Sequence, residues 1–378
     1  MRKDVIRVAM LPEKLRKTLE RVVNELKVKE NIYGIGLFGS WSRGDATTSS
    51  DVDLFLLDKG NFAYEYVERI ERGGIFIDLD HVPRQWVQGL IPVEVDQKMH
   101  EMQILYDRDW SLTNTKLLMA KSYGSPERVG IRTEAHIIDS DIYLSRATSA
   151  HSSEDYRSAY LFSTVALESI LKVLMDIALE PFSNSHAVER LESSAAKLGM
   201  QRLFVEYLNI ARLNEVDSFR VKEKLKFFRV IWGETNFTAG RNPSKLESSH
   251  FNVRTKLNYL LNPAFLQGLL ARANDLIDSG KMAEASHYLD NVLLDIIENY
   301  VWLKSSIKKV KTDHTTIMRS LESLEDKTPK NYEQIIDFFD LSNIEKLDVA
   351  NAIERTREII LKVRRDRKVL IKNHLIKS

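Results

Sequence analysis

Apolar residues near the start of the chain recur at the spacing of one helix face, and then give way to short continuous runs. The first pattern predicts a helix over residues 11–29, with an apolar stripe made of Leu15, Leu19, Val22, Val23 and Leu26. The runs that follow are bounded by glycine, proline and other turn formers, which is typical of buried strands. Four strands are predicted, over residues 33–38, 52–57, 74–82 and 104–107.

Long amphipathic helical patterns replace the strand pattern after the last predicted strand. They are interrupted by a stretch rich in turn-forming residues, 233–249, and a second helical block is predicted to start near Pro263. We therefore expect an α+β protein, in which a small mixed-sheet domain over 1–112 is followed by all-helical domains over 113–260 and 261–378.

The two helical blocks share several residues when 145–171 is laid over 271–297. The coincident pairs are Arg146/Arg272, Ala147/Ala273, Ser153/Ser279, Ala159/Ala285, Leu167/Leu293 and Ile170/Ile296. Helical hairpins share small-residue spacing by chance, so two interpretations stay open. Either the second block repeats the first, or the blocks are two unrelated helix pairs.

Composition narrows the possible chemistry. Hydrophobic residues make up 43% of the 378 residues, which is enough for packed cores and excludes global disorder. Lys and Arg number 55 against 54 Asp and Glu, so only a local basic face could bind a polyanion. The absence of cysteine excludes disulfides and thiolate metal sites. Neither a signal-peptide pattern nor a run of ~20 apolar residues is found, so we expect a cytoplasmic protein without membrane contact.

A glycine–serine pair follows the first predicted strand. Gly39 lets the backbone turn tightly and lets a ligand approach it closely. Ser40 offers a hydroxyl and a backbone N–H where a helix would begin, which suits phosphate oxygens as well as a simple helix cap. Arg43 lies one turn further on and can add a charged donor for the same oxygens or form a surface ion pair.

Acidic residues accumulate on the next strands. Asp51 and Asp53 are two positions apart, so both point to the same face of a strand. Two carboxylates held that close repel each other unless a divalent cation lies beside them. Asp78 on a later strand can complete the cluster, and Asp80, which shares its face, is the competitor. Three carboxylates beside a phosphate-binding turn suit two-metal phosphoryl chemistry.

The turn and the acids together resemble a family signature. Gly39-Ser40, a spacer and then Asp51-Val52-Asp53-Leu54 are similar to the signature of the DNA polymerase beta-like nucleotidyltransferase superfamily. Within it, residues 30–110 look most like the kanamycin-type, or aminoglycoside, branch. The features shared with that branch are Arg43 after the turn and an acidic strand before a short helix. The resemblance is specific for the fold and for nucleotide chemistry, and it does not identify the acceptor.

The resemblance implies a Mg²⁺-dependent mechanism with two ions. Asp51 and Asp53 would bind Mg²⁺ and, through it, a nucleoside triphosphate, with ATP favoured. The turn, with Ser40 and Arg43, would hold the β and γ phosphates. Asp78 would help to bind the second ion or would activate the acceptor. The acceptor hydroxyl would attack the α-phosphorus, and pyrophosphate would leave.

The sequence leaves several candidates for the general base. Members of the kanamycin-type branch use an acidic residue of their helical domain, and no motif aligns that region here. The alternatives are therefore Asp78 itself, Asp141 on the first long helix, or one of Asp139, Glu154 and Glu168.

Three functions are compatible with these residues. The first is transfer of a nucleoside monophosphate, AMP favoured, to a small-molecule hydroxyl. The second is modification of RNA or of another protein, with the locally basic stretches 220–229 and 362–377 as the docking surface or, alternatively, as solvated helix faces. The third is a helical interaction protein that senses a nucleotide without turnover. A homodimer is possible in each case.

Overall fold

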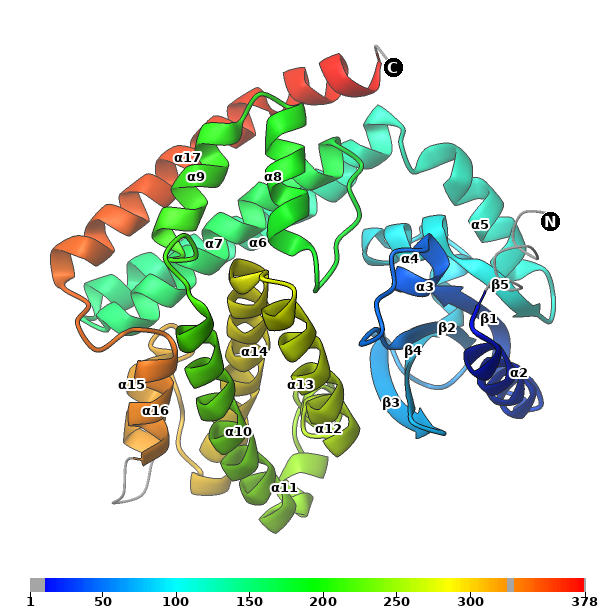
Figure 1. Ribbon diagram of the computed structural model, residues 1–378, viewed down its shortest axis with the longest axis horizontal. Helices are drawn as coiled ribbons and strands as arrows, with labels where there is room; N and C mark the ends of the chain where they lie inside the picture. Colours follow the sequence, from blue (N-terminus) through cyan, green and yellow to red (C-terminus); the bar gives the residue numbers. More distant parts are fainter. Residues whose placement is uncertain (1–10, 325–329, 377–378) are drawn as a thin grey trace. The chain divides into compact units, whose positions relative to one another are not determined.

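The computed structural model describes residues 11–324 and 330–376, and Figure 1 shows its helices and strands. These residues group into two compact units. The first unit comprises the chain up to Tyr123 together with Arg254–Arg272. The second comprises Gly124–Val253 and the chain from Ala273 onward. The predicted domain boundaries after residues 112 and 260 stay predictions.

The first unit contains a five-stranded mixed sheet with the strand order β3-β4-β2-β1-β5. Its strands are β1 Ile32–Phe38, β2 Val52–Asp58, β3 Tyr66–Arg72, β4 Ile75–Pro83 and β5 Gln103–Asp107. Strands β2 and β4 are parallel, and the other neighbours are antiparallel. The four predicted strands and the α+β fold class are confirmed. Strand β3 was missed because it is a polar edge strand whose one fully buried residue is an arginine, Arg69.

Helices cover both faces of this sheet. Helix α2, Glu13–Lys27, confirms the first predicted helix and packs its apolar stripe on Ile35, Leu54 and their neighbours. Helices α4, Asp96–Glu101, and α5, Ser111–Ser122, contribute to the core on the opposite face. Short helical elements complete the unit: α3 Gly39–Arg43, η1 Arg84–Val87 and η2 Val93–Val95. Because side chains alternate along a strand, Asp53 shares the second face with the buried Phe55 and Leu57.

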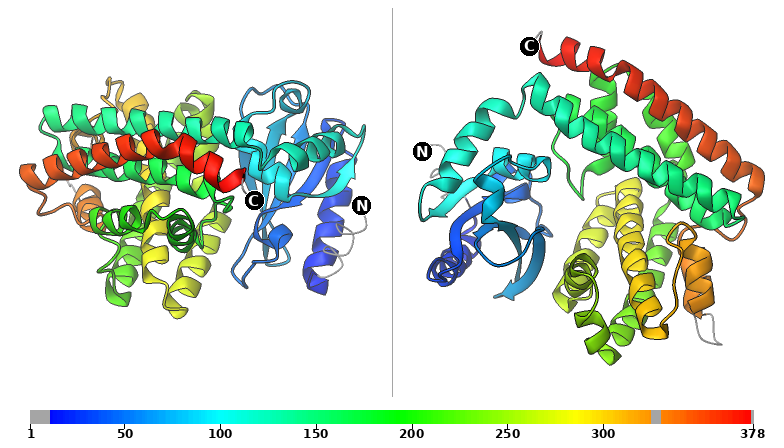
Figure 2. Two further views of the ribbon diagram at one scale, coloured as in Figure 1. Left: turned by 90° about the horizontal axis from the view of Figure 1, so that it is seen from above. Right: turned by 180° about the vertical axis from the view of Figure 1, so that it is seen from behind.

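The rest of the described chain is helical. The helices are α6 Pro126–Ser152, α7 Tyr156–Ile177, α8 Ala187–Lys197, α9 Gln201–Ile210, α10 Ser218–Arg241, α11 Pro243–Glu247, α12 Phe251–Leu260, α13 Pro263–Asp278, α14 Met282–Lys308, α15 Ile317–Leu324, α16 Lys330–Phe338 and α17 Lys346–Leu375. Helix α17 packs along α6 and α7, as both views in Figure 2 show. The predicted start near Pro263 is confirmed. The predicted break over 233–249 is wrong in its first half, because α10 continues to Arg241; its glycines at 233 and 240 face open space.

Helix α7 is long and apolar enough to cross a membrane by length and composition, and among the described helices it alone is. However, 78% of its most apolar window is buried inside the structure. The buried window contributes to the main core of the second unit, through Leu167, Ile170, Leu171 and Leu174. Helix α7 therefore has the burial expected of the core helix of a helical bundle.

Two helix starts in the second unit are capped in the same way. The backbone N–H groups of Val188 and Glu189, at the start of α8, donate to the Glu284 carboxylate of α14 at 3.1 and 2.8 Å. The N–H of Met318, at the start of α15, donates to Ser158 Oγ of α7 at 2.8 Å. Each long helix therefore satisfies the exposed N–H groups of a short helix from the other block. The duplication itself stays a prediction.

We expect replacement of Glu284 by alanine to lower the free energy of unfolding by about 1–3 kcal/mol, because it leaves one buried and one partly buried N–H group without an acceptor. Denaturant unfolding followed by circular dichroism measures this change. The matched control is Glu358→Ala on α17, where the carboxylate is 56% exposed and should contribute less than about 0.5 kcal/mol. Equal losses for the two variants would contradict the capping role.

A second prediction concerns the far end of the sheet, where His81 Nδ1 lies 2.8 Å from Asp58 Oδ2. Burial opposes protonation of His81, but Asp58 and Glu68 outweigh it and raise the pKa of His81 to about 8. Because the pKa of His81 is higher in the folded than in the unfolded chain, protonated His81 stabilises the fold fully when the pH is below its unfolded-state pKa. This contribution is lost as the pH rises through about 8. We expect wild type to lose about 2 kcal/mol between about pH 6 and pH 9. In Asp58→Asn, most of that loss should disappear from the same unfolding measurements.

Candidate functional site

The three predicted acids lie together on one face of the sheet. Asp53 and Asp78 are partners in the parallel β2–β4 pair, so their side chains stand next to each other. Asp51 directly precedes β2 and completes the group. On the other side of Asp78, the antiparallel β3–β4 pair places Arg69 opposite it. The register thus produces a row of three side chains, Arg69, Asp78 and Asp53, across three strands.

Arg69 binds two of these carboxylates at once. Its Nε and Nη2 each donate to one oxygen of Asp78 at 2.6 Å, which is a bidentate ion pair. Its Nη2 also donates to Asp51 Oδ2. The Arg69 side chain is only 3% exposed, so its charge is fully engaged in holding the carboxylates. The acids lower the free energy of its charged form, and the pKa of Arg69 is raised despite burial.

A distant part of the chain completes the site. In α12 the Tyr259 hydroxyl donates to Asp78 Oδ2 at 2.8 Å, and in α13 Arg272 Nη2 donates to Asp51 Oδ1 at 2.5 Å. Both residues belong to Arg254–Arg272, the segment that clusters with the sheet in the first unit. At Gly268, a β-carbon would lie 2.7 Å from Arg69 Nη1, so glycine is required for α13 to approach this closely.

Asp53 differs from its two neighbours because its carboxylate accepts no hydrogen bond from any residue that the structure describes. Burial, followed by the charges of Asp51 and Asp78, raises the pKa of Asp53 well above its usual range. For Asp51, burial acts in the same direction but Arg272 and Arg69 outweigh it and lower the pKa. Two arginines therefore donate to Asp51, whereas Asp53 receives no hydrogen bond from them and their charges only partly offset those of Asp51 and Asp78.

The glycine–serine turn lies directly beside Asp53. Gly39 has a φ of +71°, and a β-carbon there would lie 1.9 Å from Asp53 Oδ2. A side chain at this position would therefore collide with the carboxylate, and the left-handed backbone would also be strained. Ser40 starts the turn of α3, where its carbonyl accepts the N–H of Gly44 at 2.8 Å.

Arg43 is engaged by a carboxylate that the sequence did not predict. Its Nη1 donates to both oxygens of Glu101, at the end of α4, at 2.9 and 2.8 Å. The same carboxylate accepts the Gly39 N–H at 2.8 Å. Glu101 thus occupies Arg43, which was predicted to hold phosphate oxygens, together with the Gly39 N–H of the same turn.

The competing acids have other partners. Asp80 forms an ion pair with Lys98 at 2.6 Å, and Lys98 also contacts Glu65 at 2.8 Å. Asp80 therefore belongs to a separate structural cluster on the same strand as Asp78. Asp141, a candidate general base, lies in the second unit on α6 and pairs with Arg364 of α17 at 2.5 Å.

The other acids proposed as bases also lie in the second unit. Glu168 of α7 contacts Lys172 at 3.0 Å and His287 at 3.3 Å. Burial opposes ionisation of Glu168, but these two cations outweigh it and lower its pKa. Asp139 lies on α6 with Asp141, and Glu154 lies in the turn between α6 and α7, where it has a left-handed backbone.

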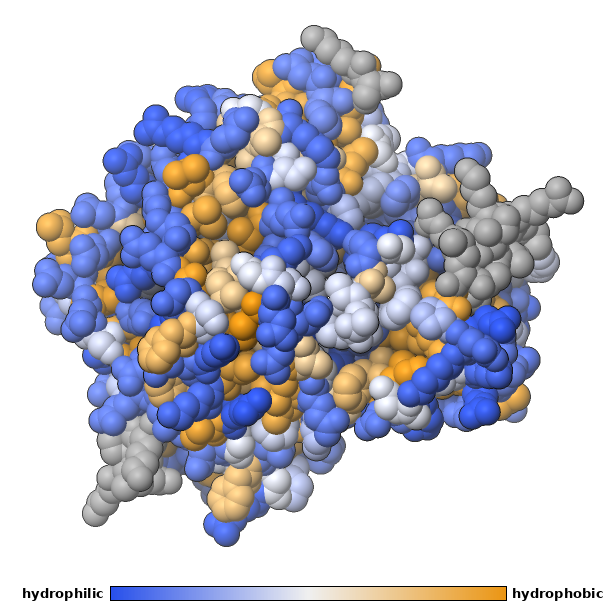
Figure 3. Space-filling view, in the orientation of Figure 1, coloured by the Kyte–Doolittle hydropathy of each residue, from blue (hydrophilic) through white to orange (hydrophobic). Residues whose placement is uncertain are grey.

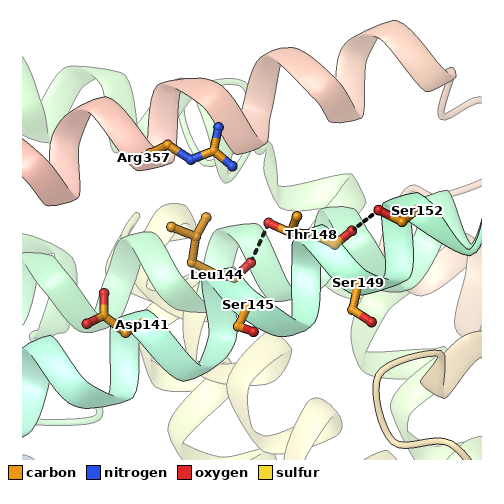
Figure 4. Close-up of a pocket in the computed structure, with 7 residues that line it drawn as sticks. All are labelled: Asp141, Leu144, Ser145, Thr148, Ser149, Ser152 and Arg357. Atoms are coloured by element: carbon orange, nitrogen blue, oxygen red, sulfur yellow. Dashed lines mark hydrogen bonds between the residues drawn. The ribbon is translucent and has the colours of Figure 1, made fainter.

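The second unit also has a groove, between α6 and α17, of about 550 Å³. Its lining residues, shown in Figure 4, are Asp141, Leu144, Ser145, Thr148, Ser149, Ser152 and Arg357. The hydroxyls of Thr148 and Ser152 donate to backbone carbonyls of their own helix, at 2.9 and 3.0 Å. These hydroxyls serve the helix rather than a ligand, so we assign no function to the groove.

The basic stretch of α17 is largely paired with acids. Arg364 and Arg367 bind Asp141 and Glu134 of α6 at 2.5 Å each, and Lys362 and Arg365 bind Asp366. Lys377 lies outside the described residues. The face in Figure 3 mixes hydrophilic and hydrophobic residues, as protein surfaces normally do. This pairing favours the solvated-face interpretation of 362–377 over an RNA-docking surface.

Four residues of the site were missed by sequence reasoning: Arg69, Glu101, Tyr259 and Arg272. For Arg69 a signal was present. The Gly73-Gly74 turn closes a two-residue hairpin in which Arg72 pairs with Ile75, and this register places Arg69 opposite Asp78. Tyr259 and Asp78 are 181 residues apart, and no short motif connects them.

We expect Arg69→Met to lower the free energy of unfolding by about 3–5 kcal/mol, because it leaves Asp51 and Asp78 without their shared counter-charge. Arg72→Met is the matched control on the same strand. Its side chain is 51% exposed and its one ion pair is 3.9 Å long, so the loss should stay below about 1 kcal/mol. Denaturant unfolding measures the free energy of unfolding of both variants. A small loss for Arg69→Met would contradict the role of Arg69 as the shared counter-charge of Asp51 and Asp78.

Comparison with known proteins finds a family match and a similar solved structure. The chain is similar to a solved structure, that of a nucleotidyltransferase-like protein from Exiguobacterium sibiricum 255-15, at 12% identity. The similarity covers 75% of this chain and 89% of that one, with a TM-score of 0.32, too low to support an argument. No curated protein matches the chain. Residues 19–109, which contain the sheet with Asp51, Asp53 and Asp78, match the model of the nucleotidyltransferase domain family.

Proposed function

We propose that the protein transfers a nucleoside monophosphate from a Mg²⁺-bound nucleoside triphosphate, with ATP favoured, to the hydroxyl of a small molecule. The observation that carries this proposal is the close grouping of Asp51, Asp53 and Asp78 beside the left-handed Gly39. Carboxylates and a tight glycine turn at one sheet edge are what phosphoryl transfer needs, because both the cation and the phosphates must approach the backbone closely. Membership of the kanamycin-type branch is part of the proposal.

The donor chemistry fits a divalent cation at Asp53 and Asp51. Carboxylate oxygens are the ligands that Mg²⁺ prefers, and the Asp53 carboxylate has like charges beside it and no hydrogen-bonding partner among the described residues. Within 11–324 and 330–376, no three His, Cys, Asp or Glu side chains are grouped tightly enough to hold a metal by themselves. Phosphate oxygens of the substrate would therefore complete the ligand set. When bound, the cation would neutralise charge on the phosphates.

The residues of the turn bind and orient the triphosphate in this proposal. The Gly39 N–H and the Arg43 guanidinium now donate to Glu101. Phosphate oxygens would replace the Glu101 carboxylate at both donors, with Ser40 adding its hydroxyl. Arg69 and Arg272, which hold the carboxylates, place two further positive charges beside the reacting phosphate.

Asp78 takes the role of general base. Its Oδ2 already accepts a hydroxyl hydrogen bond at 2.8 Å, which shows that a hydroxyl can reach this oxygen. In the reaction the acceptor hydroxyl would occupy the same place, give its proton to Asp78 and attack the α-phosphorus. Pyrophosphate would leave from the opposite side.

A second candidate function is nucleotide sensing without turnover. It is favoured by one observation, that guanidinium groups already satisfy Asp51 and Asp78. If these ion pairs persist when a nucleotide binds, the acids cannot take part in catalysis. Such a protein would bind nucleoside triphosphate and release it unchanged.

The test is label transfer from α-labelled ATP, GTP, CTP and UTP in the presence of Mg²⁺. Three acceptor pools are offered separately: small hydroxylated compounds including aminoglycosides, total RNA, and total protein. We expect label in the small-molecule pool. Asp51→Asn and Asp53→Asn should each reduce transfer by about 100-fold or more, because each removes charge that holds the reacting phosphate.

Two further variants separate the possible roles. Asp78→Asn should reduce transfer as strongly, whereas Asp141→Asn should not if Asp78 is the base. Asp278→Asn, on the exposed end of α13, is the control for a loss of charge outside the site. Binding of Mg-ATP without transfer to any pool would select the sensor function. Equal transfer by wild type and Asp53→Asn would overturn the site assignment.

A further inference from the structure

The site contains a side-chain hydroxyl of its own. Among residues 11–324 and 330–376, Tyr259 supplies the one side-chain hydroxyl that is bonded to Asp51, Asp53 or Asp78. Its phenolic oxygen lies 2.8 Å from Asp78 Oδ2, the oxygen to which the proposed function assigns the acceptor hydroxyl. A nucleophile in hydrogen-bonding contact with its base is the arrangement that nucleophilic attack requires.

Packing fixes Tyr259 in this place. The Asn262 side chain donates to the Arg69 carbonyl at 3.0 Å, and this bond attaches the α12–α13 turn to β3. The Phe265 ring packs edge-on against the Tyr259 ring with centroids 4.9 Å apart. The absence of a side chain at Gly268 lets α13 lie against Arg69. The Phe265 ring thus contacts Tyr259 directly, while Asn262 and Gly268 hold the segment that carries Tyr259 against Arg69.

The charges around the phenol suit a phosphoryl group. Arg69 Nη2 lies 3.4 Å from the Tyr259 oxygen, and Arg272 reaches Asp51 from the same segment. A nucleoside monophosphate esterified to Tyr259 would carry one negative charge, and these two guanidinium groups would lie close to it. The Tyr259 residue is only partly buried.

We infer that Tyr259 is a self-acceptor, which takes a nucleoside monophosphate from a nucleoside triphosphate bound at Asp51 and Asp53. This inference rests on the proposed function. A bond forms between the phenolic oxygen and the α-phosphorus, and the bond from the α-phosphorus to the bridging oxygen of the β-phosphate breaks. Pyrophosphate leaves, and the phenolic proton passes to Asp78. No electron transfer or further co-reactant is involved.

The product would block the site. A modified Tyr259 has no proton to donate to Asp78, and its attached nucleotide fills the space in which an external acceptor must lie. Each chain therefore reacts once, and modified chains should no longer transfer label to an external acceptor.

The experiment uses the purified full chain with Mg²⁺ and each of the four nucleoside triphosphates in turn. Intact-protein mass spectrometry followed by peptide mapping gives the extent and the position of the modification. We expect wild type to gain one nucleoside monophosphate per chain on the peptide that contains Tyr259. The rate constant should not change with protein concentration, because the reaction is intramolecular.

Matched variants identify the nucleophile. Tyr259→Phe should gain no mass, whereas Tyr64→Phe, whose ring is 55% exposed in the same unit, should react like wild type. Asp53→Asn should not react. Modification of a residue other than Tyr259, or an unmodified wild type, would overturn the inference; the wild-type peptide map decides this even if a variant fails to fold.

A failure of this inference can be told apart from a failure of the proposed function. If wild type stays unmodified but transfers label to an external acceptor, Tyr259 is not an acceptor and the nucleotidyltransferase function stands. If wild type neither reacts with itself nor labels any acceptor pool, both proposals fail. If Tyr259→Phe gains no mass but still labels the external acceptor, Tyr259 acts as a self-acceptor and is not required for transfer to other acceptors.

Discussion

The Arg69 guanidinium is the counter-charge that allows three aspartates to stand side by side in a folded sheet. Like charges about 4 Å apart repel by about 4 kcal/mol at an effective dielectric constant near 20, and burial adds to this cost. By binding Asp78 with two hydrogen bonds and Asp51 with a third, Arg69 offsets most of that repulsion. Because Arg69 lies opposite Asp78 in the β3–β4 hairpin, the register of the sheet places the guanidinium group beside the acids.

This arrangement links folding to function. Without bound nucleotide, Asp51 and Asp78 are paired with arginines, and during catalysis some of these ion pairs must give way to a cation. Arg69 is held by two carboxylates and packs against the Tyr259 and Phe265 rings, whereas Arg272 reaches Asp51 from α13. The Asp53 carboxylate accepts no hydrogen bond from a described residue, which makes it the natural first contact for an incoming cation.

The sequence was informative where the chemistry is local. Side chains alternate between the two faces of a strand, and this alternation places Asp53, Asp78 and the preceding Asp51 on one face. An alternating pattern of this kind can be recognised in the sequence. Arg69 could have been found from the Gly73-Gly74 turn, but the charged pattern of β3 concealed the strand. The remaining contacts could not be predicted, because Arg272 is 221 residues from Asp51 and its position depends on how α13 packs. Arg43 lies beside the glycine–serine turn, as the sequence predicted. Its partner Glu101 could not be predicted, because helix α4 carries no recognisable motif.

The contacts of Asp78 constrain how any acceptor enters. Its Oδ2 accepts hydrogen bonds from both Arg69 and Tyr259, which uses the lone pairs of that oxygen fully. An external hydroxyl can therefore reach Oδ2 of Asp78 only after the Tyr259 hydroxyl has left that oxygen. Modification of Tyr259 and turnover with an external acceptor are then two outcomes of one competition for a single carboxylate oxygen. The outcome depends on the α12–α13 segment, since Asn262, Phe265 and Gly268 hold the phenol in place.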